Sequence, residues 1–560
     1  MMVTRTGPGQ QDPRAIHYMV RMRDGIRLST DVYLPDGGGP FPALLTRLPY
    51  DKTGVMTPIA QFAHYFTAHG YAVVTQDVRG KFRSEGVGLN WAGEEQDGFD
   101  TIDWIIQQDW ASGAVGMWGN SYYGFTQIAA MSTQHPALRA ISPRLTGSRL
   151  GEIEVTQSGA STRPVNWSHH YLYALEFFHS QDTYQAEIDW SVRPIGQIFE
   201  GIKGELGSVS PSFDQWYPSP RVRPRFRNSS GPYAGRAIPT LLTIGWWDNC
   251  APYSWQDFEE LQRMPRWKNL LFLEIDTIDH YSNRLNDPTR VLPLTEKGWA
   301  ARIPRILDPT IRFFDVFLKN VAPMSSIPRV RWEHANLGAA VTSESWPPPG
   351  CEPLTLYAQD GNALTKEPAD SLQLQSWIHD PHNLVPSTWD EPFTPLRDEP
   401  DETLDHAHPG TVSFETDVFD TPLDIVGKIS ATGSFASDGP QLDLFARLVE
   451  VDAQGVGRRI AAGNIHSDAP TYQGKIGLHY AGYRVREGSK LRLIISSSCY
   501  PEFIPLPGTS EDPLKATTYS INHQTLALGG TDGLKIEISV MPKIGENERS
   551  LKSQSRATRS

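Results

Sequence analysis

Short apolar runs and amphipathic stretches alternate along the first 145 residues of the chain. ALLTRL (43–48) and YAVVTQDV (71–78) are nearly continuous apolar runs, which are typical of strands buried on both faces of a parallel sheet. A helix is predicted between them, and another over residues 94–109, where apolar positions recur at helical spacing. Two extended runs around Asp24-Gly25 predict a hairpin over residues 16–35.

The alternation stops at about residue 146 and returns at about residue 237. Residues 146–236 are rich in aromatic residues and then in proline and arginine, and we interpret them as a helical insertion. Strands are predicted again within IPTLLTIGWWDN (238–249) and NLLFLEID (269–276), and a closing helix over residues 309–320. This pattern predicts an α/β fold, a doubly wound sheet interrupted by a helical lid.

From about residue 328 the chain consists of strand-like runs separated by glycine, proline and aspartate turns. The runs are VRWEHA, PLTLYAQ, TVSFETDV, LDIVGKISATGSF, QLDLFARLVEV, KLRLIISSS and LKIEISVMP. No helical period competes, so an all-β sandwich is predicted, most simply a jelly roll. The expected organisation is an α/β domain over 1–145 and 237–327, a helical lid over 146–236, a jelly roll over 328–542 and a disordered tail over 543–560.

Composition narrows the classes of partner. The 560 residues are too many for one hydrophobic core, and the net charge of −13 argues against nucleic acid, whose binding requires a basic face. The basic run RVRPRFR (221–227) is interpreted as a solvated loop. Neither an apolar signal segment nor a stretch of 18 apolar residues occurs, so secretion and membrane insertion are not expected. Three widely spaced cysteines fit a reducing compartment, and we expect a cytoplasmic protein.

A serine lies on a glycine-flanked corner between a short apolar strand and an apolar helix, in AVGMWGNSYYGFTQIAA (114–130). Gly119 and Gly124 remove side chains that would block so sharp a turn. Ser121 would lie at the apex, close to the helix N-terminus, where the backbone N–H of Tyr122 has no intrahelical partner and could stabilise an oxyanion. The alternative interpretation of the same residues is an ordinary N-cap serine.

A serine that transfers acyl groups also needs a base and an acid that orients the base. Asp248 ends the predicted strand LLTIGWW and His280 follows the strand LFLEID, so the order of serine, aspartate and histidine is that of α/β-hydrolases. Taken singly, Asp248 could be a turn aspartate and His280 a loop histidine. Asp276 and Asp279 are rival acids, but Asp279 adjoins His280, and the side chains of neighbouring loop residues usually diverge. No metal, phosphate or dinucleotide motif is present, so no cofactor is expected.

Several segments resemble the family of bacterial cocaine esterase and X-prolyl dipeptidyl peptidase. Gly119-Asn120-Ser121-Tyr122-Tyr123-Gly124 is similar to its G-x-S-Y-x-G elbow, and Gly245-Trp246-Trp247-Asp248 is similar to G-W-[YW]-D. RLPYDK (47–52) resembles R-x-P-Y-x-K, and DVRG (77–80) with SEG (84–86) resembles D-x-R-G followed by S-E-G. In the β domain, Asp380-Pro381 and the run IISSS (494–498) lie where the family's jelly roll has comparable elements.

The resemblance implies a role for each matching residue. Ser121 would be the nucleophile, His280 the general base and Asp248 the acid that orients it. The hydroxyl of Tyr50 would be a second oxyanion donor beside the Tyr122 N–H. The implied function is that of a serine hydrolase, which cleaves a carboxylic ester or an amide of an apolar small molecule through an acyl-enzyme, with no metal or organic cofactor.

Substrate-binding residues are expected in the lid and beside the acid. Trp167, Tyr171 and Phe177 of the lid, together with Trp247, are predicted to line an apolar pocket, although the lid aromatics could instead pack only on one another.

The chain also departs from the family pattern at two places. The family commonly has G-P-W-x-H before the histidine, where this chain has DTIDH (276–280). Cys250 and Ala251 stand where the α-amino-acid ester hydrolases of this family carry acidic residues that bind a substrate ammonium, and a neutral pair cannot balance a buried cation.

Other functions stay open at this point. An X-prolyl peptidase or amide acylase would need lid carboxylates, such as Glu152, Glu154 or Glu176, to hold a substrate amine. Ser121, Asp248 and His280 could also serve an enzyme of biosynthetic acyl transfer or cyclisation. Alternatively, the protein could be non-catalytic and bind ligands through the jelly roll. The expected partner is a small-molecule ester or amide, with no nucleic acid and no membrane. An unpaired jelly-roll edge could pair with a second copy, giving a homodimer.

Overall fold

The computed structural model of the protein describes residues 3–5, 9–54, 57–152, 160–163, 184–186, 188–206, 225–281, 296–387, 396, 402 and 407–542. Contacts divide the chain into two compact units. The first unit comprises residues 1–151, 166–275 and 280–329, and the second comprises 152–165, 276–279 and 330–560.

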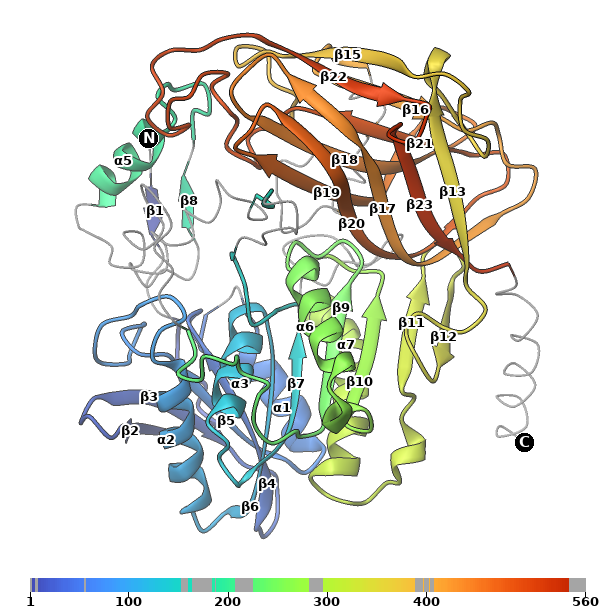
Figure 1. The fold of residues 1–560 in the computed structure, drawn as a ribbon. Coiled ribbons are helices and arrows are strands. Elements are labelled where there is room, and N and C mark those ends of the chain that lie inside the picture. The colour runs from blue at the N-terminus through green and yellow to red at the C-terminus, as the bar shows by residue number, and fades with distance from the viewer. Residues whose placement is uncertain are drawn as a thin grey trace. The chain divides into compact units, whose positions relative to one another are not determined.

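Strands and helices alternate in the first unit, as the apolar pattern predicts (Figure 1). Its strands are β1 (Val3–Arg5), β2 (Ile16–Arg21), β3 (Arg27–Tyr33), β4 (Phe41–Leu48), β5 (Ala72–Asp77), β6 (Ala111–Asn120), β7 (Leu138–Arg144), β8 (Tyr184–Ala186), β9 (Thr240–Gly245) and β10 (Leu271–Asp276). Its helices are α1 (Ile59–Ala68), α2 (Glu94–Ile106), α3 (Ser121–Ser132), α5 (Gly196–Leu206), α6 (Ala251–Arg263), the single turn η2 (Pro265–Trp267) and α7 (Glu296–Phe317).

The strands of the main sheet in this unit run in the order β10-β9-β7-β6-β4-β5-β3-β2. β4 pairs in parallel with both β5 and β6, β6 with β7, and β7 with β9, whereas β2 and β3 extend the sheet in antiparallel pairing. The chain goes from β4 to one side and then returns to its other side at β6, which makes the carboxyl ends of β4 and β6 a topological switch point. The predicted α/β fold class is confirmed.

Helices cover the sheet in two contacting pairs, α2 with α3 and α1 with α7. Phe62 and Phe66 of α1 belong to one buried cluster with Leu307 and Phe314 of α7. Helix α7 begins at Glu296, well before the predicted start at residue 309, because the helix continues through Pro304 and Pro309. A proline inside a helix costs roughly 3 kcal/mol, which the burial of several large apolar side chains of about 1.5–3 kcal/mol each can offset.

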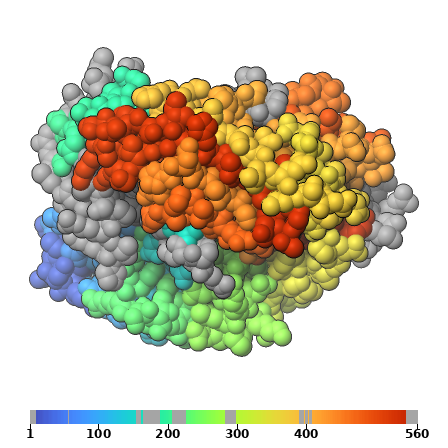
Figure 2. Space-filling model, turned by 45° about the horizontal axis from the view of Figure 1, so that its top comes forward, coloured from blue at the N-terminus to red at the C-terminus, as the bar shows by residue number. Residues whose placement is uncertain are grey.

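The second unit is built from strands, as predicted, and Figure 2 shows their yellow to red residues packed side by side over one surface. The strands are β11 (Val330–His334), β12 (Ala339–Ser343), β13 (Glu352–Gln359), β14 (Ala363–Thr365), β15 (Gln373–His379), β16 (Thr411–Glu415), β17 (Leu423–Ser437), β18 (Leu442–Val451), β19 (Gly457–Ser467), β20 (Thr471–Val485), β21 (Lys490–Ser496), β22 (Asn522–Leu528) and β23 (Lys535–Val540). All seven predicted runs form strands. The long strand β17 pairs antiparallel with β20, β22 and β23, and the predicted all-β fold of this region is confirmed.

Several predictions fall on residues outside the described part of the chain. These are the tail at 543–560, about half of the insertion at 146–236 and, within it, Trp167, Tyr171 and Phe177. The described part of the insertion includes β8 and α5. None of the helices described combines the length and the apolar character needed to cross a bilayer. All three cysteines of the chain are described, and none forms a disulfide.

A buried carboxyl group joins α6 to the segment that follows β7. Asp257 accepts hydrogen bonds from the Ser148 backbone N–H at 2.6 Å and from the Ser148 hydroxyl at 2.5 Å. Burial raises the pKa of Asp257 from its ordinary value of 3.8 to about 6, against the opposing effect of the two hydrogen bonds. Between about pH 4 and pH 6 the folded protein therefore binds this proton more tightly than the unfolded chain.

The free energy of unfolding should accordingly fall as the pH rises through that window, and Asp257→Asn should remove this part of the slope. The variant has no carboxyl group to ionise, so its stability relative to the wild type should increase by about 2 kcal/mol between pH 4 and pH 7. Scanning calorimetry of both proteins over this range measures the difference in Tm. A difference that stays constant with pH would contradict the raised pKa.

Candidate active site

Three polar side chains come together from the carboxyl ends of three strands in the first unit. Ser121 follows β6, Asp248 follows β9 and His280 follows β10. The Nε2 atom of His280 lies 3.0 Å from the Ser121 hydroxyl, and its Nδ1 lies 2.6 Å from Oδ1 of Asp248. The side chain of Asp248 is fully buried, and that of His280 is 9% exposed. With Nδ1 donating to the carboxylate, Nε2 is left as the acceptor that faces the serine proton.

The turn that carries Ser121 is sharp and strained. Ser121 has a φ of +52°, a left-handed conformation that costs a residue other than glycine on the order of 1–3 kcal/mol. Gly119 also has a positive φ, and a Cβ there would lie 2.1 Å from the Tyr123 ring. At Gly124 a Cβ would lie 2.5 Å from the Thr146 side chain. Both glycines are therefore required by the close approach of neighbouring groups, as the motif predicts.

Two side chains that the sequence analysis did not single out hold this turn. The Thr146 hydroxyl donates to the carbonyl of Ser121 at 2.6 Å. The amide of Gln127 donates to the carbonyls of Gly119 and Tyr123 at 3.1 and 3.0 Å. These bonds connect both sides of the corner to α3 and to the segment after β7, so the strained conformation is fixed by its surroundings.

The two expected oxyanion donors lie next to the serine. Tyr50 follows β4, the neighbour of β6 in the sheet, and its hydroxyl is 3.4 Å from the Ser121 hydroxyl. Tyr122 is the second residue of α3, and the first-turn N–H groups of a helix find no acceptor within the helix. Tyr50 and Ser121 thus lie at the switch point of the sheet, where ligands bind in open α/β sheets.

The rival acids have other partners. Asp276 pairs with Arg331, with 3.2 Å between Oδ1 and the guanidinium. Asp279 is completely buried and accepts a long hydrogen bond of 3.4 Å from the Leu396 backbone. Only Asp248, among the described residues, has its carboxylate on Nδ1 of His280. Trp247 is buried beside this aspartate, with 8% of its surface exposed, and its contact with substrate stays a prediction.

One cluster of possible metal ligands is found within the described ranges, formed by Asp248, Cys250 and His280. One ligand atom of each lies within 4.8 Å of the others. Burial raises the pKa of the Cys250 thiol well above its ordinary value, and the nearby Asp248 carboxylate raises it further. Both ring nitrogens of His280 already have partners, Nδ1 at 2.6 Å from Asp248 and Nε2 at 3.0 Å from the Ser121 hydroxyl. The geometry of Asp248 and His280 fits acid–base chemistry better than metal binding.

Comparisons with known proteins agree with the fold. Residues 24–280 match the sequence profile of the X-Pro dipeptidyl-peptidase (S15 family), and residues 324–534 match that of the X-Pro dipeptidyl-peptidase C-terminal non-catalytic domain. The chain is 27% identical to the cocaine esterase of a Rhodococcus species over 475 residues, which are 79% of this chain and 81% of that protein.

Two solved structures share the fold. An aminopeptidase from a marine sediment archaeon, Thaumarchaeota archaeon, aligns with a TM-score of 0.77 at 21% identity and covers 95% of this chain and 98% of its own. An α-amino acid ester hydrolase aligns with a TM-score of 0.74 at 22% identity and covers 94% of this chain and 96% of its own.

Fold and profiles together define an α/β-hydrolase joined to a β-rich C-terminal domain. More narrowly, the chain belongs to the family of the S15 X-Pro dipeptidyl-peptidases and cocaine esterase, which confirms the membership predicted from its elbow and G-W-W-D segments.

Proposed function

We propose that this protein is a serine esterase in which Ser121 is the nucleophile, His280 the general base and Asp248 the acid that orients the base. The observation that carries this proposal is the continuous chain of contacts from the Ser121 hydroxyl through the His280 ring to Asp248, at 3.0 and 2.6 Å. The family membership and the 27% identity to cocaine esterase support hydrolysis of an ester.

The reaction follows from the positions of the protons. His280 Nε2 takes the proton of Ser121 while the serine oxygen forms a bond with the ester carbonyl carbon. The carbon–oxygen bond to the leaving alcohol then breaks, and His280 returns its proton to that alcohol. Water then attacks the carbonyl carbon of the acyl-serine while His280 accepts a proton from the water. The bond between that carbon and the Ser121 oxygen breaks, His280 returns the proton to this oxygen, and the acid product leaves. Asp248 keeps its charge throughout and stabilises the imidazolium that forms twice in the cycle.

The negative charge on the carbonyl oxygen needs donors that are already in place. The Tyr50 hydroxyl and the backbone N–H of Tyr122 flank Ser121, on the sides of β4 and of α3. Donors fixed before the reaction stabilise the developing charge without reorganisation, and this is commonly the largest single contribution to such catalysis.

The expected substrate is an apolar small ester without an α-ammonium group. Cys250 and Ala251 are both buried directly after Asp248, and the raised pKa of the Cys250 thiol keeps it neutral. A cationic substrate group at this place would have no opposite charge from these two residues, and a buried unpaired cation is strongly unfavourable. This observation favours esters over substrates held by a free amine next to the catalytic acid.

The proposal is tested by labelling and by a substrate comparison. A fluorophosphonate probe should label the wild type at Ser121, and aryl esters of acetate, butyrate and benzoate should be hydrolysed, with much slower cleavage of a dipeptidyl-proline anilide. A competing alcohol nucleophile should divert little of the product. Absence of labelling would overturn the proposal, and preferred cleavage of the anilide or dominant acyl transfer to the alcohol would replace the esterase with a peptidase or a transferase.

Tyr50→Phe should lower kcat by about 10²- to 10³-fold with little change in KM, because the hydroxyl is expected to bind the oxygen only after it becomes charged. Steady-state kinetics with an aryl ester measure both constants. Tyr65→Phe is a matched control, since Tyr65 packs partly buried against the same apolar cluster and its hydroxyl donates to Asp308 at 2.7 Å. An unchanged kcat in Tyr50→Phe would remove Tyr50 from the oxyanion site.

A further inference from the structure

The phenol of Tyr122 is fixed in a fully buried position behind the Ser121 turn. Its hydroxyl donates to Oε1 of Glu94 at 2.9 Å and accepts from the backbone N–H of Trp91 at 2.9 Å. The Trp91 ring stacks on the Tyr122 ring, with 4.5 Å between centroids and 19° between planes. Burial and the Glu94 carboxylate raise the pKa of Tyr122 well above its ordinary value, so the phenol keeps the proton that it donates.

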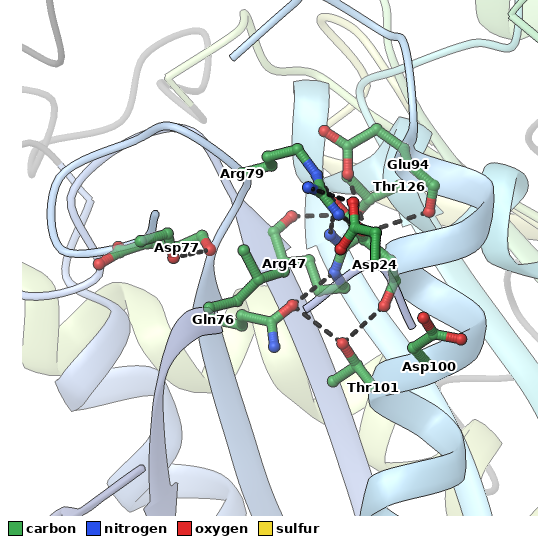
Figure 3. Close-up of polar contacts among 12 residues, drawn as sticks. Asp24, Arg47, Gln76, Asp77, Arg79, Glu94, Asp100, Thr101 and Thr126 are labelled. Carbon is green, nitrogen blue, oxygen red and sulfur yellow. Dashed lines mark hydrogen bonds and ion pairs between the residues drawn. The ribbon is translucent and has the colours of Figure 1, made fainter. Parts of the chain in front are cut away.

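Glu94 is in turn bound to a buried arginine from the central strand β4. The guanidinium of Arg47 donates to Oε2 of Glu94 at 2.8 Å, to the Glu94 carbonyl at 3.2 Å and to the Gln76 side chain at 2.8 Å. Figure 3 shows Arg47 between Gln76 on one side and Glu94 on the other. Arg47 is completely buried, and the Thr126 hydroxyl of α3 donates to its carbonyl at 3.0 Å. Arg47 therefore contacts α3 directly through Thr126, and indirectly through Glu94 and Tyr122.

A second acidic residue balances the arginine and leads toward the surface. Asp97 lies 3.7 Å from the Arg47 guanidinium and accepts from Arg79 at 2.6 and 3.0 Å. Arg79 also donates to the half-exposed Asp24 at 2.7 Å (Figure 3). Each buried charge thus faces an opposite charge, and such pairing is what allows charged groups to remain buried.

The contacts of Arg47, Glu94 and Tyr122 end at the turn that carries the nucleophile and an oxyanion donor. The backbone N–H of Tyr122 is one of the two expected oxyanion donors, and the Tyr122 backbone adjoins the strained Ser121. The side chain that fixes this backbone is held at its far end by Glu94 and at its face by Trp91. A donor that stabilises a transition state must be placed accurately, and small displacements caused by distant groups can reduce rates strongly.

We propose that Glu94 and Arg47 are positioning residues for catalysis, which act by anchoring the Tyr122 phenol so that the Tyr122 N–H and the Ser121 hydroxyl are held in their reactive places. This inference rests on the proposed esterase function. Both side chains are buried, and the chain of contacts from Arg47 through Glu94 reaches the Ser121 turn at Tyr122.

The test removes the Tyr122 hydroxyl, which binds Glu94, and keeps the aromatic ring. Tyr122→Phe should lower kcat toward an aryl ester about tenfold to hundredfold, with KM within about twofold of the wild type, because the lost contact matters mainly in the transition state. Glu94→Gln keeps a hydrogen-bond acceptor for the phenol and should cause a smaller loss of the same kind. The double variant should lose no more than Tyr122→Phe alone, since both changes break one chain of contacts.

Tyr71→Phe is the matched control. Tyr71 is also completely buried in the first unit, and its hydroxyl donates to Asp315 at 2.7 Å. A general effect of losing one buried phenol hydrogen bond would appear equally in its kcat and Tm. Binding of a boronic acid, which mimics the tetrahedral intermediate, should weaken in parallel with kcat/KM in Tyr122→Phe and stay unchanged in Tyr71→Phe.

The outcomes separate this inference from the function on which it rests. Fluorophosphonate labelling of the wild type with a Tyr122→Phe kcat equal to that of Tyr71→Phe would overturn the positioning role and leave the esterase proposal intact. If Tyr122→Phe does not fold, Glu94→Gln decides, and an unchanged kcat and boronic acid affinity in that variant would overturn the inference. Absence of labelling in the wild type would overturn the esterase function first.

Discussion

Replacing Ser121 with alanine is expected to lower kcat toward aryl esters by about 10⁴- to 10⁶-fold, because members of a nucleophile–base–acid unit fail together when one is removed. The variant should keep the fold, since alanine is smaller than serine and the turn is held by Thr146 and Gln127. Stopped assays with concentrated enzyme, together with loss of fluorophosphonate labelling, measure the effect.

A serine at the other end of the same helix gives the control. Ser132 closes α3, and its hydroxyl donates to the Ala129 carbonyl at 2.7 Å, far along the helix from the turn. Ser132→Ala should retain the kcat of the wild type within about twofold. Substantial esterase activity remaining in Ser121→Ala would show that another group is the nucleophile.

Asp248→Asn should lower kcat by about 10⁴-fold, with little change in structure. The asparagine amide would place a donor opposite Nδ1 of His280, favour the tautomer with the proton on Nε2 and leave no base for the serine proton. Steady-state kinetics with thermal unfolding as a check on folding measure the outcome.

Asp279→Asn is the matched comparison for this prediction. Asp279 is a buried aspartate immediately before His280, and its carboxylate accepts from the Leu396 backbone. Its replacement should leave kcat near the wild-type value even if Tm falls. The reverse pattern, with the large loss in Asp279→Asn and little in Asp248→Asn, would show that the acid is Asp279.

The contacts among Ser121, Asp248 and His280 could be anticipated because each follows a strand that is recognisable from its apolar run. Parallel strands bring their carboxyl ends to one edge of the sheet, so three polar residues at three such ends must lie near one another. The sequence already favoured Asp248 over Asp276 and Asp279, from its place after a strand and from the resemblance of GWWD to the family segment. The carboxylate of Asp248 lies 2.6 Å from Nδ1 of His280, as that choice requires. The contact between Tyr50 and Ser121 was anticipated only from the resemblance of RLPYDK to the family segment.

The anchor behind Tyr122 was not anticipated, although one sign of it was visible. Arg47 is a charged residue inside the apolar run ALLTRL, and a buried strand holds a charge only if a partner is supplied. The partner, Glu94, is 47 residues away and comes from a helix whose first turn carries several acidic residues. Nothing in the local pattern indicates which of them meets the arginine, because that depends on how α2 packs on β4.

The predicted start of helix α7 was wrong for a different reason. The predicted helix over residues 309–320 begins at Pro309, yet Pro309 lies in the interior of a helix that begins at Glu296. Apolar residues on both sides of the proline, Leu307 and Ile311 among them, are buried in one cluster with α1. Tertiary packing here outweighs the local preference, which a single sequence does not reveal.

For protein engineering, the buried pair of Arg47 and Glu94 means that position 122 cannot be varied independently. Removing one partner of a buried ion pair typically costs about 3–5 kcal/mol, so a library that randomises position 47 or position 94 alone would consist mostly of destabilised clones. Replacing the set together with apolar residues of matched volume avoids that loss and has stabilised other proteins. Libraries aimed at a new acyl specificity are therefore better directed at other positions, and residues 47, 94 and 122 should be either kept or replaced together.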